Sequence, residues 1–128
     1  MNNNLTLLVA RILLALIFVL AGLNKFGSIA GTAGYISSVG LPAPTILAWL
    51  TAIFEVVAGL MIAAGFMTRL ASYALAAFCV VSALIFHNNL GDQTQFIMFA
   101  KNLAIAGGFL ALSVSGPGAL SVEGRRGA

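Results

Sequence analysis

Four long apolar stretches with very few charged residues make up most of this chain. They cover about residues 5–26, 44–66, 70–87 and 96–114. At about 1.5 Å per residue of helix, each stretch can cross a hydrocarbon layer of about 30 Å. Backbone polar groups in lipid must be bonded within their own segment, and none of the stretches alternates as a barrel strand does. We therefore predict four transmembrane helices.

The composition agrees with a membrane protein. Of the 128 residues, 61% are hydrophobic and 7% are charged, and a soluble domain this small could not bury so much apolar surface. These values exclude a disordered chain and an ordinary cytosolic enzyme. The net charge of +3 comes without a basic stripe, so no nucleic-acid partner is expected. The lone Cys79 excludes an internal disulfide, and no metal-ligand spacing is present.

The segment 27–41 is too short to span a bilayer and is rich in glycine. Its apolar residues recur at helical spacing, which predicts a short helix that lies in the interface or re-enters it. Pro44 is suited to begin the next span. The other connections are short, so the sequence predicts a single all-α domain, an antiparallel bundle of four transmembrane helices, followed by a tail at 116–128.

The basic residues predict how the bundle is oriented. Arg69, Arg125 and Arg126 fall on the same side of the membrane as the N-terminus. Positive charge favours the cytoplasmic side. We therefore expect both termini in the cytoplasm of a bacterium, with the protein in the inner (plasma) membrane.

Three charged residues fall well inside the predicted spans, namely Arg11, Glu55 and Lys101, whereas Lys25 lies at the very end of the first span. Each costs about 2.5–3.5 kcal/mol on insertion scales, so each needs a structural or functional reason. Glu55 is the only acid among them, and burial requires a neutralising partner. Depth along the helices brackets Glu55 between Lys101 on one side and Arg11 on the other, and either could pair with it.

Two interpretations of these charges stay open. In the first, Glu55 forms an ion pair that only sets the helix register. In the second, it lines a polar pocket in the outer half of the bundle, with other polar or aromatic residues near the same end. The candidate catalytic residues are Glu55, His87 and Lys101; the candidate ligand-binding residues are Lys25, Tyr35, Trp49 and Asn102; Arg11 and Arg69 are expected to be structural charges. Aromatic residues near a membrane boundary also serve as interface anchors, as does a histidine at a helix end.

Several short motifs in order resemble those of the DoxX family of small four-helix bacterial inner-membrane proteins. They are Phe18-Val19-Leu20-Ala21-Gly22-Leu23-Asn24-Lys25-Phe26, Gly40-Leu41-Pro42, Glu55, Gly65 with Thr68-Arg69, His87, Lys101-Asn102-Leu103-Ala104, and Gly116-Pro117-Gly118 with Ser121. Glu123 departs from the family pattern, which often has Asp near this position. The resemblance covers nearly the whole chain.

The resemblance implies redox-linked work, because family members are associated with quinone-dependent oxidoreductase assemblies and oxidative-stress defence. We therefore expect a redox-linked subunit that binds a quinone-like molecule and has no covalently bound cofactor. Its electrons would come through a redox protein or a larger membrane complex. A structural or assembly subunit, a path for protons or small solutes, and a homo-oligomer are the alternatives.

Overall fold

The computed structural model describes residues 3–126, with side chains up to Arg125. Residues 127–128 of the expected tail and the side chain of Arg126 lie outside the described part. The helices are α1 (Asn3–Phe26), α2 (Ile29–Ser38), α3 (Pro44–Ala64), α4 (Thr68–Phe86), α5 (Gln93–Ser115) and α6 (Val122–Arg126).

Local sequence signals explain several of these boundaries. Pro44 lies in the first turn of α3, as expected. The helix ends at Ala64 and is capped by Gly65, whose φ of 71° lies in the left-handed region. α5 begins at Gln93, earlier than the apolar stretch, because the side chain of Asp92 accepts a hydrogen bond of 3.2 Å from the amide of Thr94. The short helix α6 was not expected.

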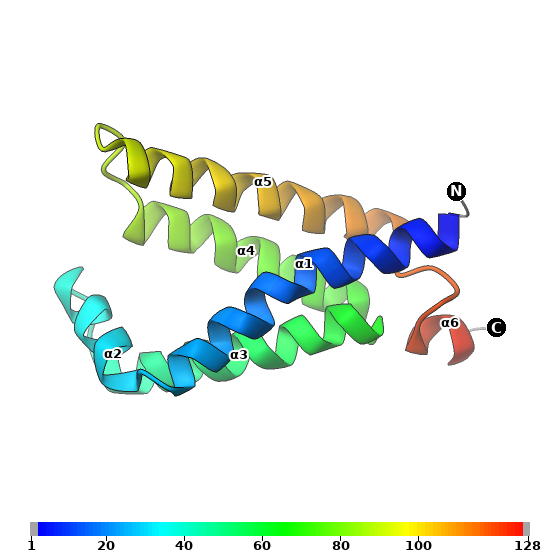
Figure 1. The fold of residues 1–128 in the computed structure, drawn as a ribbon, viewed down its shortest axis with the longest axis horizontal. Helices are drawn as coiled ribbons and strands as arrows, with labels where there is room; N and C mark the ends of the chain where they lie inside the picture. Colours follow the sequence, from blue (N-terminus) through cyan, green and yellow to red (C-terminus); the bar gives the residue numbers. More distant parts are fainter. Residues whose placement is uncertain (1–2, 127–128) are drawn as a thin grey trace.

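The four long helices form two pairs, as Figure 1 shows. α1 packs along α3, and α4 packs along α5, while a smaller contact joins α3 to α4. Neighbouring helices run in opposite directions. α2 and the α4–α5 connection lie at one end, which we call the α2 end, and the start of α1 and α6 lie at the other, the α6 end.

Two glycines allow α1 and α3 to approach closely. A Cβ atom at Gly22 would lie 2.5 Å from Cγ2 of Val56 and 2.9 Å from the carbonyl oxygen of Ala52. A Cβ atom at Gly59 would lie 2.9 Å from Cγ2 of Val19. Small residues at such crossings let transmembrane helices pack backbone to backbone. The glycines thereby fix which residues of α1 and α3 face each other.

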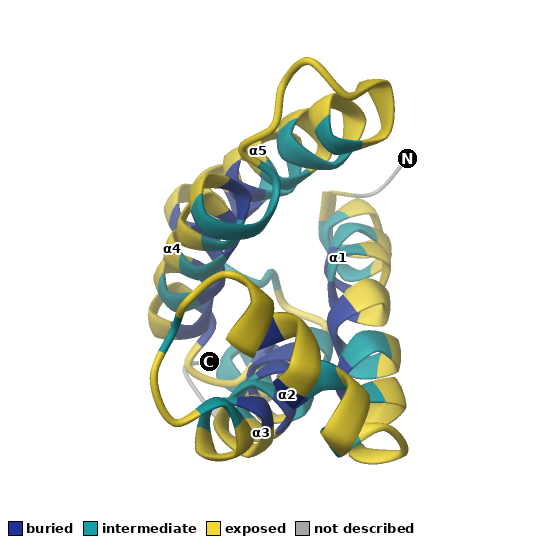
Figure 2. Ribbon diagram, turned by 90° about the vertical axis from the view of Figure 1, so that its left-hand side faces the viewer, coloured by how far each residue is buried: buried dark blue, intermediate teal, exposed yellow. Residues whose placement is uncertain are grey.

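The exposed surface of the helices is largely apolar. Buried residues point into the bundle, and exposed residues cover the outside of every helix (Figure 2). Leu13, Leu84 and Val114 are among the large apolar side chains that are more than half exposed. α1, α3, α4 and α5 are long and apolar enough to cross a membrane. The structure confirms the all-helical fold with four candidate spans and a short helix between the first two.

Candidate functional site

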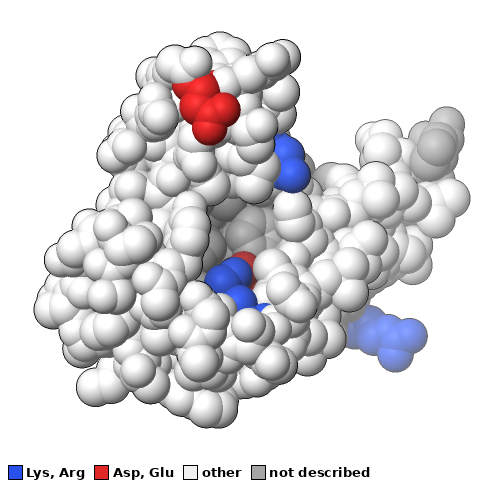
Figure 3. Space-filling model, turned by 60° about the vertical axis from the view of Figure 1, so that its left-hand side comes forward, with Lys and Arg blue, Asp and Glu red and all other residues white. Residues whose placement is uncertain are grey.

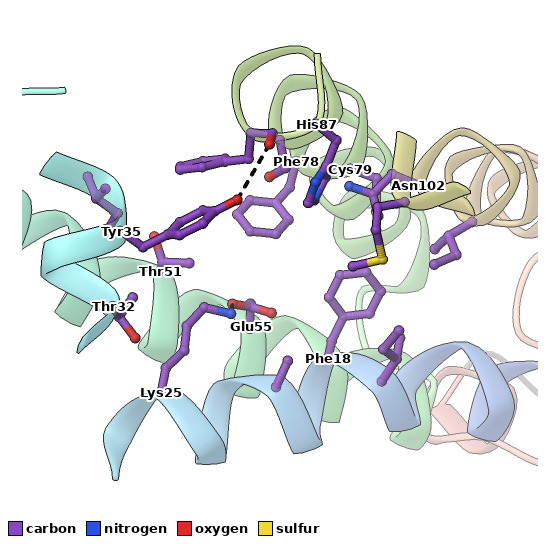
Figure 4. A pocket seen from close by; sticks show the side chains of 17 residues that line it. Phe18, Lys25, Thr32, Tyr35, Thr51, Glu55, Phe78, Cys79, His87 and Asn102 are labelled. Atoms are coloured by element: carbon purple, nitrogen blue, oxygen red, sulfur yellow. Dashed lines mark hydrogen bonds and ion pairs between the residues drawn. The ribbon is translucent and has the colours of Figure 1, made fainter. Parts of the chain in front are cut away.

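A cavity of about 300 Å³ lies between the two helix pairs, toward the α2 end. Residues from α1, α2, α3, α4 and α5 line it, and Figure 4 shows their side chains converging on one space. Most of the lining is apolar. The polar and ionisable lining residues are Lys25, Thr32, Tyr35, Thr51, Glu55, Cys79, Ser82, His87 and Asn102.

An ion pair between Lys25 and Glu55 borders the cavity. Nζ of Lys25 lies 2.5 Å from Oε1 of Glu55. The Glu55 side chain is 4% exposed and that of Lys25 is 28% exposed. The expectation that Glu55 pairs with Lys101 or Arg11 is therefore wrong, because the neutralising cation comes from the end of α1.

The reason for this pairing is the register between α1 and α3. Gly22 of α1 lies against Ala52 and Val56 of α3. Lys25 follows Gly22 by almost one turn and so lies near the level of residue 51, about one turn from Glu55. A lysine side chain spans that distance, and here it extends into the bundle rather than out to water.

Lys101 lies away from this pair. Its side chain is exposed on α5, outside the cavity lining, whereas its neighbour Asn102 lines the cavity. Consecutive residues on a helix point about 100° apart, so only one of the two can face the interior. The placement of Lys101 among the pocket residues is corrected accordingly.

Arg11 lies toward the α6 end and is fully buried, far along α1 from Lys25. Its guanidinium donates hydrogen bonds to the carbonyl oxygens of Ile62 (3.4 Å), Ala63 (2.9 Å) and Leu120. The first two belong to the last turn of α3, whose carbonyls lack partners within the helix. Arg11 therefore joins α1, the end of α3 and the C-terminal segment, and it does not neutralise Glu55.

The other wall of the cavity carries polar groups from α4 and α5. His87 caps the end of α4, and its Nδ1 lies 3.1 Å from Oε1 of Gln95. Asn102 lines the same wall (Figure 4). These groups lie across the cavity from Lys25 and Glu55.

α2 covers part of the cavity at its own end. The ring of Tyr35 stacks on that of Phe86, with centroids 5.2 Å apart, and its hydroxyl donates to the carbonyl oxygen of Phe86 at 3.4 Å. Ala33 and Ile36 pack on Ala48 of α3. Tyr35 thus joins α2, which packs on α3, to the end of α4. It also lines the cavity.

Two more predicted residues lie elsewhere. Trp49 is 46% exposed on α3, and its ring packs against Phe26, with centroids 5.8 Å apart, outside the cavity lining. The exposed Arg69 donates from Nε to the carbonyl oxygen of Ser113 at 3.1 Å and so joins α4 to α5. The expected contact of Trp49 with a ligand in this cavity is therefore corrected, because its ring faces outward.

Four phenylalanines, one from each long helix, pack together beside the cavity, and two of them, Phe18 and Phe78, line it and form its floor. Ring centroids are 5.3 Å apart for Phe54 and Phe78, 6.4 Å for Phe78 and Phe18, and 5.6 Å for Phe18 and Phe109. The sequence analysis did not single out this layer. Phenylalanines in an apolar span carry no signal that separates a lipid-facing ring from an inward one.

Comparisons with known proteins agree with the resemblance. Residues 6–88 match the DoxX family. The chain is 40% identical to inner membrane protein YqjF of Escherichia coli (strain K12) over 91% of this chain and 88% of the relative. It is 38% identical to inner membrane protein YphA of the same organism, over 93% and 89%.

A third relative comes from a different bacterium. The chain is 30% identical to a Bacillus subtilis (strain 168) protein named "Putative oxidoreductase CatD", over 82% of each chain. No solved structure matches the chain. The match to most of the first three long helices and the similarity over nearly the full length of three relatives lead to one conclusion: the chain is a membrane protein of the DoxX family.

Proposed function

We propose that this protein is a redox-linked membrane subunit whose cavity binds the ring of a quinone-class molecule. The observation that carries the proposal is the Lys25–Glu55 ion pair at the wall of an apolar, aromatic-floored cavity. Ligand sites are typically apolar pockets of about 300–1,000 Å³ with a few convergent polar groups. The similarity to the protein named "Putative oxidoreductase CatD" supports a redox-linked role.

The distribution of polar groups suits a flat ring with an oxygen at each of two opposite edges. Lys25 and Glu55 lie on one wall, and His87 and Asn102 lie on the other. The ammonium group of Lys25 can donate a hydrogen bond to one carbonyl oxygen, and the amide of Asn102 can donate to the other. Glu55 and His87 can hold protons beside the same two positions. The phenylalanine floor provides an apolar contact for the ring.

Glu55 faces a cavity, and this placement favours a binding site over an ion pair that only sets the register. A buried ion pair repays its desolvation only with excellent geometry and further hydrogen bonds, and the cavity beside Glu55 leaves room for a ligand that would supply them. The quinone-class molecule would supply the redox chemistry, with electrons exchanged with a partner protein. The residues of this chain would bind the ring, orient it and hold protons next to its oxygens.

The test is binding of decyl-ubiquinone to the purified protein in lipid nanodiscs. Binding is measured as quenching of the protein's intrinsic fluorescence. The double variant Lys25→Met with Glu55→Gln removes both charges together and leaves neither unpaired. Hydrogen bonds to charged groups contribute about 1.5–3 kcal/mol, so we expect an affinity loss of tenfold or more. Trp49→Phe is unsuitable as a control in this readout, because Trp49 is the chain's one tryptophan.

Arg69→Met is the matched control, because it removes one exposed charge outside the cavity. It is expected to bind as the unchanged protein does. Unaltered affinity in the double variant, with its fold intact, would contradict the proposal and would leave a structural ion pair as the better explanation.

A further inference from the structure

We infer that the ligand enters the cavity sideways from the lipid, through the gap between the halves of α1 and α5 nearest α2, and that it carries an apolar tail which stays in this gap. The inference rests on the proposed function, since it takes the cavity to bind a ring with polar edges. It adds the route of entry and the chemical class of the substituent. Three features of the structure support it.

The first feature is the contact between α1 and α5, which lies on the side of the cavity toward the α6 end. Leu14 of α1 lies against Gly108 of α5, where an added Cβ atom would be 3.2 Å from Cδ2 of Leu14. Phe18 and Phe109 meet at nearly the same level. From there toward the α2 end, the two helices line opposite sides of the cavity.

The second feature is a residue beside this gap that both lines the cavity and reaches the outer surface. Ile17 lines the cavity and is also 39% exposed. Figure 3, which is turned so that the α2 end comes forward, shows a hollow in the molecular surface with a basic and an acidic side chain inside it. Because Ile17 lies within the candidate span Asn3–Phe26, the surface beside it faces lipid rather than water.

The third feature is the cover formed by α2 over the end of the cavity. The stacked rings of Tyr35 and Phe86 and the hydroxyl–carbonyl contact between the same residues join α2 to the end of α4. A ligand arriving along the bundle axis past α2 would meet this contact at the mouth of the cavity. A ligand arriving between α1 and α5 would not.

Lys101 lies at one edge of the gap between α1 and α5. It precedes Gly108 by seven residues, and Ala21 follows Leu14 by seven residues. Seven residues are about two helical turns, so Lys101 and Ala21 lie on the helix faces that meet lower down. They therefore mark opposite edges of the gap.

The experiment bridges the gap and the cover separately, in a Cys79→Ala background that contains no other cysteine. The gap bridge joins Ala21→Cys to Lys101→Cys with a cleavable bis-maleimide. The cover bridge joins Ser38→Cys to Asn88→Cys, two exposed positions that flank the Tyr35–Phe86 contact. Each single-cysteine variant, treated with a monofunctional maleimide, is the matched control.

The measurement is the association rate of decyl-ubiquinone in nanodiscs. We expect the gap bridge to slow association at least tenfold and cleavage of the linker to restore it, while the cover bridge has little effect. A block by the cover bridge, alone or together with the gap bridge, overturns the inference, because the route would then lead through the aqueous end. If neither bridge slows association, the inference is overturned as well.

A second readout separates this inference from the proposed function. In the Cys79→Ala background, Ser82→Cys places a thiol on the cavity wall. A lipid-soluble maleimide should label it faster than a charged, water-soluble one, and the gap bridge should abolish this preference. If no quinone binds but the lipid-soluble maleimide still labels faster, the proposed function fails, whereas the inferred route of entry between α1 and α5 stands. Faster labelling by the water-soluble reagent overturns the route whatever binds.

Discussion

The ammonium group of Lys25 lies 2.5 Å from the carboxylate of Glu55, although Lys25 ends the first span and Glu55 lies in the middle of the second. The close crossing of α1 and α3 brings the two together. The lysine side chain extends toward the bundle interior, where it neutralises a nearly buried acid. This relationship organises one wall of the cavity, and it can be tested apart from ligand binding.

Removing only one charged partner of the Lys25–Glu55 ion pair should destabilise the fold. Lys25→Met leaves the Glu55 carboxylate without its cation, and an unsatisfied buried group costs about 1–3 kcal/mol. The double variant with Glu55→Gln should recover most of that loss, since no charge is left unpaired. The free energy of unfolding in mixed micelles measures both. Equal stability of Lys25→Met and the unchanged protein would argue against the pair as a stabilising contact.

The glycine crossing makes a second prediction. Gly22→Ala places a Cβ atom 2.5 Å from Val56 and 2.9 Å from the Ala52 carbonyl. Overpacking of this kind costs about 1–3 kcal/mol. It should also weaken quinone binding, because a shift of α1 moves Lys25. Thermal unfolding in detergent and the fluorescence titration measure the two effects.

Gly107→Ala is the control for this substitution, because no described atom outside its own helix lies within 4 Å of the added Cβ. Alanine is a better helix former than glycine, by about 1 kcal/mol at most, so Gly107→Ala should be neutral or slightly stabilising. Matching losses in both variants would show that the crossing is not the cause.

Arg11 should hold the C-terminal segment to the bundle. Arg11→Met removes the donors to the carbonyls of Ala63 and Leu120 and leaves those oxygens unsatisfied, at a cost of about 1–3 kcal/mol. We therefore expect faster proteolysis within residues 116–126 in Arg11→Met. Mass spectrometry of the cleavage products measures the rate. Arg69→Met also removes a hydrogen bond to a helix carbonyl, but Arg69 is exposed and water can replace the donor, so this variant should leave the C-terminal segment as protected as in the unchanged protein. Undiminished protection in Arg11→Met would count against this role.

The orientation predicted from the arginines is testable in cells. A phosphatase that is active only outside the cytoplasm should be inactive when fused after residue 126 and active when inserted in the α4–α5 connection. Positive residues near the α6 end favour the cytoplasmic side. Strong activity of the C-terminal fusion would reverse the assignment of both ends.

The sequence alone determined the four apolar spans, the short helix between the first two and the family. These features depend on length, composition and local motifs, which are properties of contiguous residues. It also identified Lys25, Tyr35, Glu55, His87 and Asn102 as candidates for a site, and all of these line the cavity. Their chemistry is costly or unusual in a span, so each stands out against an apolar background.

The tertiary structure decided which of these residues meet. Depth along isolated helices suggested Lys101 or Arg11 as the partner of Glu55, whereas the glycine crossing of α1 and α3 selected Lys25. Helix rotation placed Lys101 outside the cavity lining and Asn102 on its wall. Register and rotation arise from packing between segments distant in sequence, and small glycine contacts set them. No local pattern in the chain encodes that choice.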